Sequence, residues 1–130
     1  MSSLIYKAIV TIEGHGEYFY VGQTSSTFKS RLANHKSDIK LRHRSGTALS
    51  HFIWKLKDQG KNWSIKWEKV CEEPIYSRES KQCHLCSAEK LEILKIMKRF
   101  PDNTINKRSE LLSYCHHKRR EMLAYPEDPG

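Results

Sequence analysis

The N-terminal segment carries the pattern of a β-hairpin, and this pattern restricts the fold more than any other feature of the chain. Residues 4–12 are rich in Ile, Val, Thr and Tyr, and Glu13-Gly14-His15-Gly16 then interrupts the apolar run. The run resumes over residues 18–21. β-branched and aromatic residues on both sides of a Gly-rich turn are typical of two antiparallel strands. The chain is therefore predicted to begin with a hairpin.

The rest of the chain predicts helices around one more strand. Capping hydroxyls precede apolar residues at helical spacing, which predicts a helix over roughly 27–40. Four further elements are expected: a helix from about 47 to 60, a half-buried strand at 63–67, a helix capped by Ser87 and ended by Pro101, and a last helix from Ser109 to about Leu123. We predict an α+β fold, with a small antiparallel three-stranded sheet flanked by helices, in one domain over 4–123 with a flexible tail at 124–130.

Charge and composition point to a polyanionic partner. The chain has 23 Lys and Arg against 15 Asp and Glu, a net charge of +8, and this balance favours nucleic acid. No segment has the roughly 20 apolar residues of a membrane span, and the N-terminus lacks a secretory pattern. We expect an intracellular protein, and one module of a longer polypeptide.

Arg31 and His35 lie four positions apart and share one face of the predicted first helix. An arginine at the margin of an apolar face needs acceptors, and either a phosphodiester or a structural carboxylate would satisfy it. Tyr6 and Tyr20 could present hydroxyls on one side of the hairpin, or serve only as core residues. Gly22 would let a substrate backbone approach.

A cysteine pair near the C-terminal half predicts a metal site. Cys83-x-x-Cys86 together with Cys115 and His117 gives a tetrahedral Cys₃His set spanning 83–117. Four protein ligands close the coordination shell, which is typical of structural Zn²⁺. The alternatives are idle thiols or a different ligand set, in which the competing residues are Cys71, His84 and His116.

Several of these residues together resemble the signature of the GIY-YIG nucleases. The residues that carry this resemblance are Leu4-Ile5-Tyr6, Tyr20-Val21-Gly22, Arg31, His35, Glu89 and Asn106. Longer segments are similar to the endonuclease domain of Penelope-like retroelements, and they cover residues 20–31, 53–57, 83–91 and 106–111. The resemblance extends over nearly the whole chain.

The resemblance implies a phosphodiesterase that uses a single Mg²⁺ or Mn²⁺ ion. Tyr6 would assist the attacking water, Arg31 would stabilise the charge on the phosphate, and Glu89 would hold the ion. The remaining roles are less specific. Tyr20 would position the phosphate or the nucleophile, His35 would accept a proton or hold Tyr6, and Asn106 would orient sheet-to-helix contacts or a phosphate.

The chain departs from the family pattern at three points. Leu4 stands where the first motif has Gly. Tyr6 and Tyr20 are 14 positions apart, and a longer hairpin turn would absorb the extra residues. Glu92 lies one helical turn beyond Glu89 and is a second candidate for the metal.

These features lead to one main hypothesis and one alternative. The main hypothesis is a nickase that leaves a 3′-hydroxyl, which the resemblance implies would prime reverse transcription by a fused reverse transcriptase in the nucleus. The alternative is a catalytically silent, zinc-containing nucleic-acid-binding module. Basic residues near the helix ends would grip the DNA backbone: Lys36, Lys40, Arg42, Arg44, Lys107, Arg108 and Arg119. The three tryptophans would either stack on bases or pack in the core.

Overall fold

Three antiparallel strands form the centre of the fold, in the order β2-β1-β3. The computed structural model describes residues 3–25, 27–42, 46–75, 83–112 and 115. β1 (Leu4–Ile12) is the middle strand, between β2 (Gly16–Thr24) and β3 (Trp63–Glu72). The pairing of β1 with β3 shifts by one residue beside Tyr6, which is a β-bulge. This layout confirms the predicted α+β class with a three-stranded antiparallel sheet.

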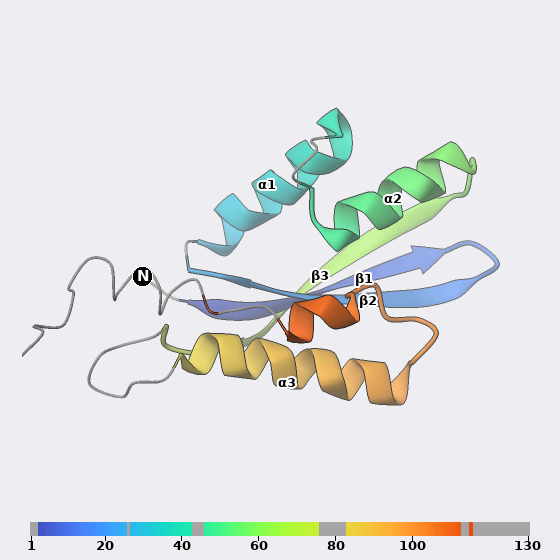
Figure 1. Ribbon diagram of the computed structural model, residues 1–130. Helices are drawn as coiled ribbons and strands as arrows, with labels where there is room; N and C mark the ends of the chain where they lie inside the picture. Colours follow the sequence, from blue (N-terminus) through green and yellow to red (C-terminus); the bar gives the residue numbers. More distant parts are fainter. Residues whose placement is uncertain (1–2, 26, 43–45, 76–82, 113–114, 116–130) are drawn as a thin grey trace, which may run out of the picture.

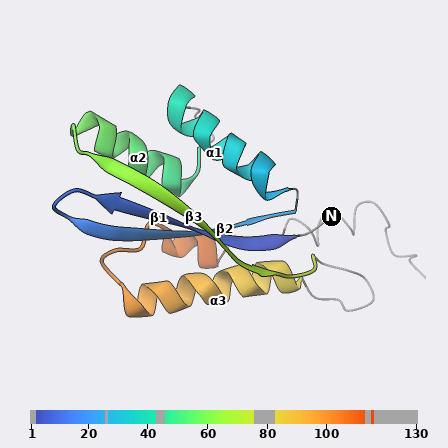
Figure 2. The same ribbon diagram turned by 180° about the vertical axis from the view of Figure 1, so that it is seen from behind.

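Helices cover both faces of the sheet (Figure 1). α1 (Phe28–Leu41) and α2 (Ala48–Asp58) lie over one face. α3 (His84–Arg99) covers the other face, as the reverse view also shows (Figure 2). η1 (Arg108–Leu111) is a short 3₁₀ helix that contacts α3. Among the described residues, no helix combines the length and the apolar character that crossing a bilayer requires.

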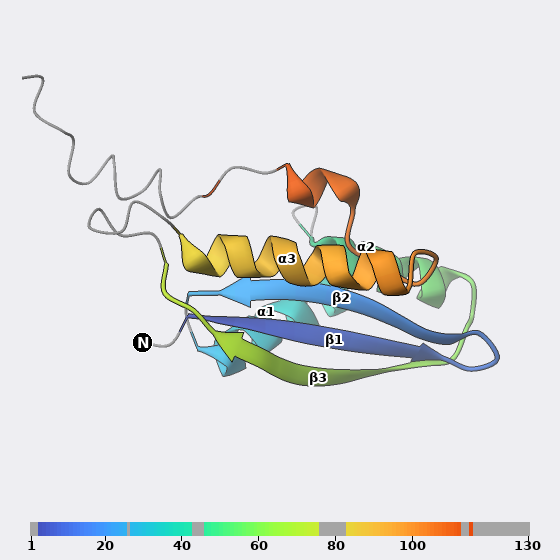
Figure 3. The same ribbon diagram turned by 90° about the horizontal axis from the view of Figure 1, so that it is seen from below.

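The strand alternation produces one apolar cluster on each face of the sheet. Even-numbered residues of β1 pack against α1 and α2, whereas Ile5 and Val21 pack against α3. α3 runs along β2 rather than across the whole sheet (Figure 3), so the second cluster is the smaller one. The first cluster therefore supplies most of the buried apolar surface, and it also encloses Tyr6 and Tyr20.

The outer edge of β2 is closed by the segment that follows α3. Phe19 N–H donates to the Asn103 carbonyl at 2.8 Å, and Ile105 N–H donates to the Phe19 carbonyl at 2.7 Å. The side chain of Asn106 then accepts from Val21 N–H and donates to the Val21 carbonyl, both at 2.8 Å. An amide side chain thus replaces a missing strand, because it offers one acceptor and one donor. β2 is left with fewer unpaired edge groups.

Most predicted elements lie where the sequence placed them, and the differences have local causes. Thr27 and Thr47 cap α1 and α2 through their hydroxyls, as expected. β3 continues to Glu72, past the predicted end, because β1 offers it a partner along its full length.

Two helix predictions were wrong at their starts. α3 begins at His84 rather than after Ser87, since the fully buried Leu85 anchors the first turn. The predicted helix from Ser109 begins one residue earlier and is a 3₁₀ turn as far as Leu111. The rest of that predicted helix, and the tail at 124–130, lie outside the described residues.

The closure of the β2 edge predicts that Asn106→Ala is strongly destabilising. The substitution leaves a buried N–H and a buried carbonyl without partners, which should lower the free energy of unfolding by roughly 2–4 kcal/mol. The matched control is Asn103→Ala, which removes one exposed bond to the Glu17 carbonyl and should cost about 1 kcal/mol or less. Urea unfolding of both variants measures the difference, and equal losses would contradict this role for Asn106.

Candidate functional site

Tyr6 and Gly22 face each other across the β1-β2 pair, and the glycine makes room for the phenol. A Cβ placed on Gly22 would lie 2.4 Å from the Tyr6 ring and hydroxyl. Gly22 therefore provides space for Tyr6, rather than for the approach of a substrate backbone as predicted. Tyr20 pairs with Ala8 and lies on the same face as Tyr6. The two hydroxyls share one side of the sheet, as expected.

Tyr6 joins the sheet to two residues of α1. Its hydroxyl lies 2.5 Å from His35 Nε2, and Arg31 Nε donates to the same oxygen at 3.1 Å. Tyr6 and His35 are both fully buried, whereas Arg31 is half-buried. Among the described residues, hydrogen bonds from the Arg31 side chain involve Nε, so its terminal nitrogens are the groups that can meet an outside acceptor.

The protonation states of this group follow from burial. Burial, helped by the nearby Arg31 charge, lowers the pKa of His35 to about 4, so the imidazole is neutral at pH 7. Burial raises the pKa of Tyr6, while Arg31 opposes that shift. A neutral Tyr6 hydroxyl donating to Nε2 assigns the imidazole proton to Nδ1. His35 Nδ1 is buried and has no hydrogen-bond partner among the described residues.

Tyr20 is a buried tyrosine whose pKa depends on several neighbouring groups of the site. Burial is the largest reason that its pKa is raised, and Tyr6 and Glu110 add to the effect. Arg31 lowers it and Glu89 raises it further. Groups from β1, α1, α3 and η1 therefore surround one buried phenol on β2.

Glu89 is the acidic member of the site, and Glu92 is not. Gln23 Nε2 donates to Glu89 Oε1 at 3.2 Å. Burial raises the pKa of Glu89 to about 7, which the Gln23 bond and Arg31 oppose. Glu92 instead pairs with Lys95 at 3.2 Å. Of the two glutamates, Glu89 is the one on which Arg31 acts, and its role as the metal ligand stays a prediction.

Asn106 and Glu110 approach the site from the segment after α3. Asn106 is buried and holds Val21, so its place is structural, in line with the predicted sheet-to-helix role. Its Nδ2 also donates to Glu110 Oε1 at 3.4 Å. Glu110 accepts from Lys107 N–H at 2.5 Å, and burial raises the pKa of its carboxyl. It adds a second negative group beside Glu89.

Three cysteines form a cluster that can hold a metal ion. The Sγ atoms of Cys83, Cys86 and Cys115 all lie within 4.8 Å of one another, and Cys86 and Cys115 are 3.4 Å apart. Tetrahedral zinc with Zn–S bonds of about 2.3 Å would separate its sulfurs by roughly 3.8 Å. Burial raises the pKa of the Cys86 thiol, so a bound cation is needed to hold it as a thiolate.

The competing ligands are partly resolved. Within the described part of the chain, neither Cys71 nor His84 belongs to the cluster. His116 and His117 lie outside the described residues, so the predicted fourth ligand stays a prediction.

Gln23 connects the cysteine cluster to Glu89. Its Nε2 lies 3.5 Å from Cys86 Sγ and 3.2 Å from Glu89 Oε1. Sequence reasoning did not identify Gln23 or Glu110 as site residues. Their only signals were position: Gln23 directly follows Gly22, and Glu110 lies four residues after Asn106.

The structure places five of the predicted DNA-contacting residues. Lys36 and Lys40 are exposed on α1, and Lys107 and Arg108 are exposed at the start of η1. Arg42 forms a two-bond ion pair with Asp58, with its closest contact at 2.7 Å. Arg44 and Arg119 lie outside the described residues.

The close fit between Tyr6 and Gly22 predicts that Gly22→Ala disrupts the site. The added methyl group forces the phenol away from Arg31 and His35, and overpacking of this kind costs about 1–3 kcal/mol. In a Tyr6→Leu background the phenol terminus is absent, so Gly22→Ala should lower the free energy of unfolding by less than it does in the parent. Additive thermal-unfolding losses in this double-mutant cycle would contradict the contact.

Comparison with known proteins gives no assignment. No family model matches the chain, and no curated protein and no solved structure matches it. The conclusions about the site therefore depend on its own geometry and chemistry.

Proposed function

We propose that this protein is a divalent-metal-dependent DNA endonuclease that hydrolyses one phosphodiester bond and leaves a 3′-hydroxyl. One observation carries the proposal: a guanidinium, a hydrogen-bonded phenol and imidazole, and a half-buried carboxylate lie around Tyr20. Phosphodiester hydrolysis needs positive charge for the phosphate, a proton acceptor for water and an oxygen ligand for a cation. The site contains each of these groups.

Arg31 is the group that would bind the scissile phosphate. Its Nε is fixed on the Tyr6 oxygen, so the guanidinium plane is oriented before substrate arrives. A half-buried guanidinium is screened less by solvent than one on the surface, which strengthens its attraction for phosphate oxygens. The terminal nitrogens can then donate to the negative charge that grows in the transition state.

Tyr6 and His35 would move the proton of the attacking water. Water gives a proton to the Tyr6 oxygen as the Tyr6 hydroxyl proton passes to His35 Nε2, and the water oxygen bonds to phosphorus. The bond from phosphorus to the 3′ oxygen breaks, and solvent water protonates that leaving oxygen to give the 3′-hydroxyl. Arg31 assists because its N–H stabilises negative charge on the phenol oxygen. Tyr6 is enclosed, so water must reach its hydroxyl past the half-buried Arg31.

The carboxylates fit a hard divalent cation. Glu89 has its pKa raised to about 7 and Glu110 adds negative charge beside it, so a cation would relieve an unfavourable pair. Glu89 would hold Mg²⁺ or Mn²⁺, with Glu110 close to its coordination shell. Such an ion supplies charge neutralisation at the leaving 3′ oxygen.

The cysteine cluster would hold structural zinc. Cys83, Cys86 and Cys115 supply three thiolates, and His117 is the proposed fourth ligand. The ion would tie the first turn of α3 to the segment after η1. Because Gln23 is hydrogen-bonded to both Cys86 and Glu89, fixing Cys86 would also restrict the position of Glu89.

The narrower biological setting depends on the resemblance to Penelope-like retroelements. It supports DNA as the substrate, a fused reverse transcriptase that extends the new 3′-hydroxyl, and action in the nucleus. The net charge of +8 is consistent with a nucleic-acid partner.

A second candidate is a silent nucleic-acid-binding module on the same scaffold. The specific observation in its favour is that the Tyr6 side chain has no exposed surface. Leu4, at the altered motif position, is likewise buried in the first apolar cluster. In this case DNA binds but is not cut.

The zinc proposal predicts that Cys86→Ser loses metal and stability. Parent protein should contain about one zinc ion per chain, and the variant much less, because a thiolate ligand is gone. Its free energy of unfolding should fall by at least ~2 kcal/mol. Cys71→Ser is the matched control, since Cys71 lies outside the cluster, and it should keep its zinc. Elemental analysis and thermal unfolding test both, and equal zinc in the two variants would reject the site.

The endonuclease proposal predicts that Glu89→Gln abolishes nicking of supercoiled plasmid in Mg²⁺ or Mn²⁺. The amide keeps the shape of the side chain and removes the charge that would bind the cation, so the rate should fall at least ~100-fold. Relaxed circles from the parent, and none from the variant, are the expected result. DNA binding without any cutting by the parent would favour the silent module.

Stability provides the control for that variant. The pKa of Glu89 is about 7 in the folded protein, and its ordinary value is 4.5. Ionisation of Glu89 therefore lowers the free energy of unfolding as the pH rises between these two values. Glu89→Gln should therefore be more stable than the parent at pH 8 in zinc-containing buffer without Mg²⁺, by on the order of 2 kcal/mol. At pH 4 the two proteins should be equal. A variant that is less stable at pH 8 has lost its fold rather than its cation ligand.

A further inference from the structure

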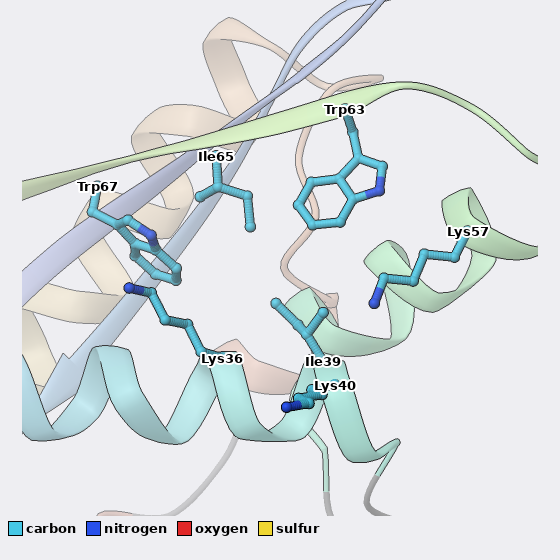
Figure 4. A pocket seen from close by; sticks show the side chains of 7 residues that line it. All are labelled: Lys36, Ile39, Lys40, Lys57, Trp63, Ile65 and Trp67. Atoms are coloured by element: carbon cyan, nitrogen blue, oxygen red, sulfur yellow. The ribbon is translucent and has the colours of Figure 1, made fainter.

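A groove that combines lysines and indoles lies between β3, α1 and α2. Its volume is about 310 Å³. Figure 4 shows two indoles on β3 facing lysine side chains on the two helices, with apolar side chains between them. The lining residues are Lys36, Ile39, Lys40, Lys57, Trp63, Ile65 and Trp67.

The three lysines of the groove, Lys36, Lys40 and Lys57, form no ion pair with a described residue. Lys36 and Lys40 lie one helical turn apart, and like charges at this spacing repel. An anion in the groove would relieve that repulsion.

The indoles are placed to offer aromatic surface to a ligand. Trp63 and Trp67 alternate with exposed residues of β3, and both are only half-buried against the first apolar cluster. Two half-buried indoles beside three lysines provide stacking faces and phosphate contacts together.

Trp67 lines the groove and also contacts the candidate active site. Its ring centroid lies 5.4 Å from that of His35 and 6.1 Å from that of Tyr6. A ligand that contacts Trp67 in the groove is therefore separated from the catalytic imidazole by one side chain.

We propose that this groove binds an unpaired nucleotide of single-stranded DNA that flanks the cleaved bond. The base stacks on Trp63, and the adjacent phosphates bind Lys36, Lys40 and Lys57. A paired and stacked base has both faces covered by its neighbours, so the groove selects unpaired DNA. The choice of DNA as ligand rests on the proposed function, whereas an acidic peptide is the competing ligand that the experiment must exclude.

The test compares single-stranded and duplex oligonucleotides of equal length by fluorescence anisotropy, in buffer without Mg²⁺ or Mn²⁺. Trp63→Leu keeps an apolar side chain and removes the stacking face, and among the described residues the ring contacts of Tyr6, Tyr20 and His35 do not include Trp63. Its affinity for the single strand should fall about 5- to 100-fold, and its affinity for the duplex should change less than about twofold. Equal losses for both ligands, or no loss for either, would overturn the proposal.

Charge is tested with two triple variants of equal net charge. The groove variant changes Lys36, Lys40 and Lys57 to Gln. The control variant changes three lysines that lie outside the groove to Gln: Lys66, Lys95 and Lys98. The groove variant should bind single strands at least about tenfold more weakly than the control variant. Equal binding would show that only overall charge matters, and tighter binding of a poly-glutamate peptide than of oligo-dT would assign the groove to an acidic peptide.

Glu89→Gln separates this proposal from the nuclease. In the Glu89→Gln background, Trp63→Leu should weaken single-strand binding by the same factor as in the parent, because Glu89 lies on α3 and does not line the groove. If the parent binds through Trp63 but never nicks plasmid, the nuclease proposal fails and the groove stands. If the parent nicks while the groove variants bind normally, the groove proposal fails alone.

Discussion

The contact between Tyr6 and Gly22 is the constraint on which the site depends. β1 is the middle strand, so the segment around Tyr6 is paired with a strand on each side and its position is fixed by the sheet. The absent side chain of Gly22 lets the phenol lie over β2, where its oxygen meets Arg31 and His35 from α1. A larger residue at position 22 would separate the sheet half of the site from the helix half.

A second set of contacts brings the acidic half of the site to the same place. The segment after α3 closes the edge of β2 through Asn106, and this closure also carries Glu110 toward Glu89. Gln23 extends from β2 to both Glu89 and Cys86. The cysteine cluster and Glu89 are thus linked by hydrogen bonds through one side chain.

Burial gives these groups their chemical properties. His35 is neutral, Tyr6 keeps its proton, and the pKa of Glu89 is about 7. Each of these properties follows from removal of the group from water. Glu110 adds to the cost of ionising Glu89, because the two carboxylates carry like charges. A bound cation would lower that cost.

The sequence by itself determined the local elements. The hairpin pattern predicted β1 and β2, alternation predicted β3, and the threonine caps placed α1 and α2, because these signals depend on nearby residues. The resemblance to a known motif also selected Tyr6, Arg31 and His35, which the structure joins by hydrogen bonds. Only the tertiary structure decided that Gly22 holds space for Tyr6, that Gln23 and Glu110 join the site, and that Leu85 starts α3 early. Those contacts join residues distant in sequence, and their positions follow from the strand order and from which face each helix covers, which no local pattern encodes.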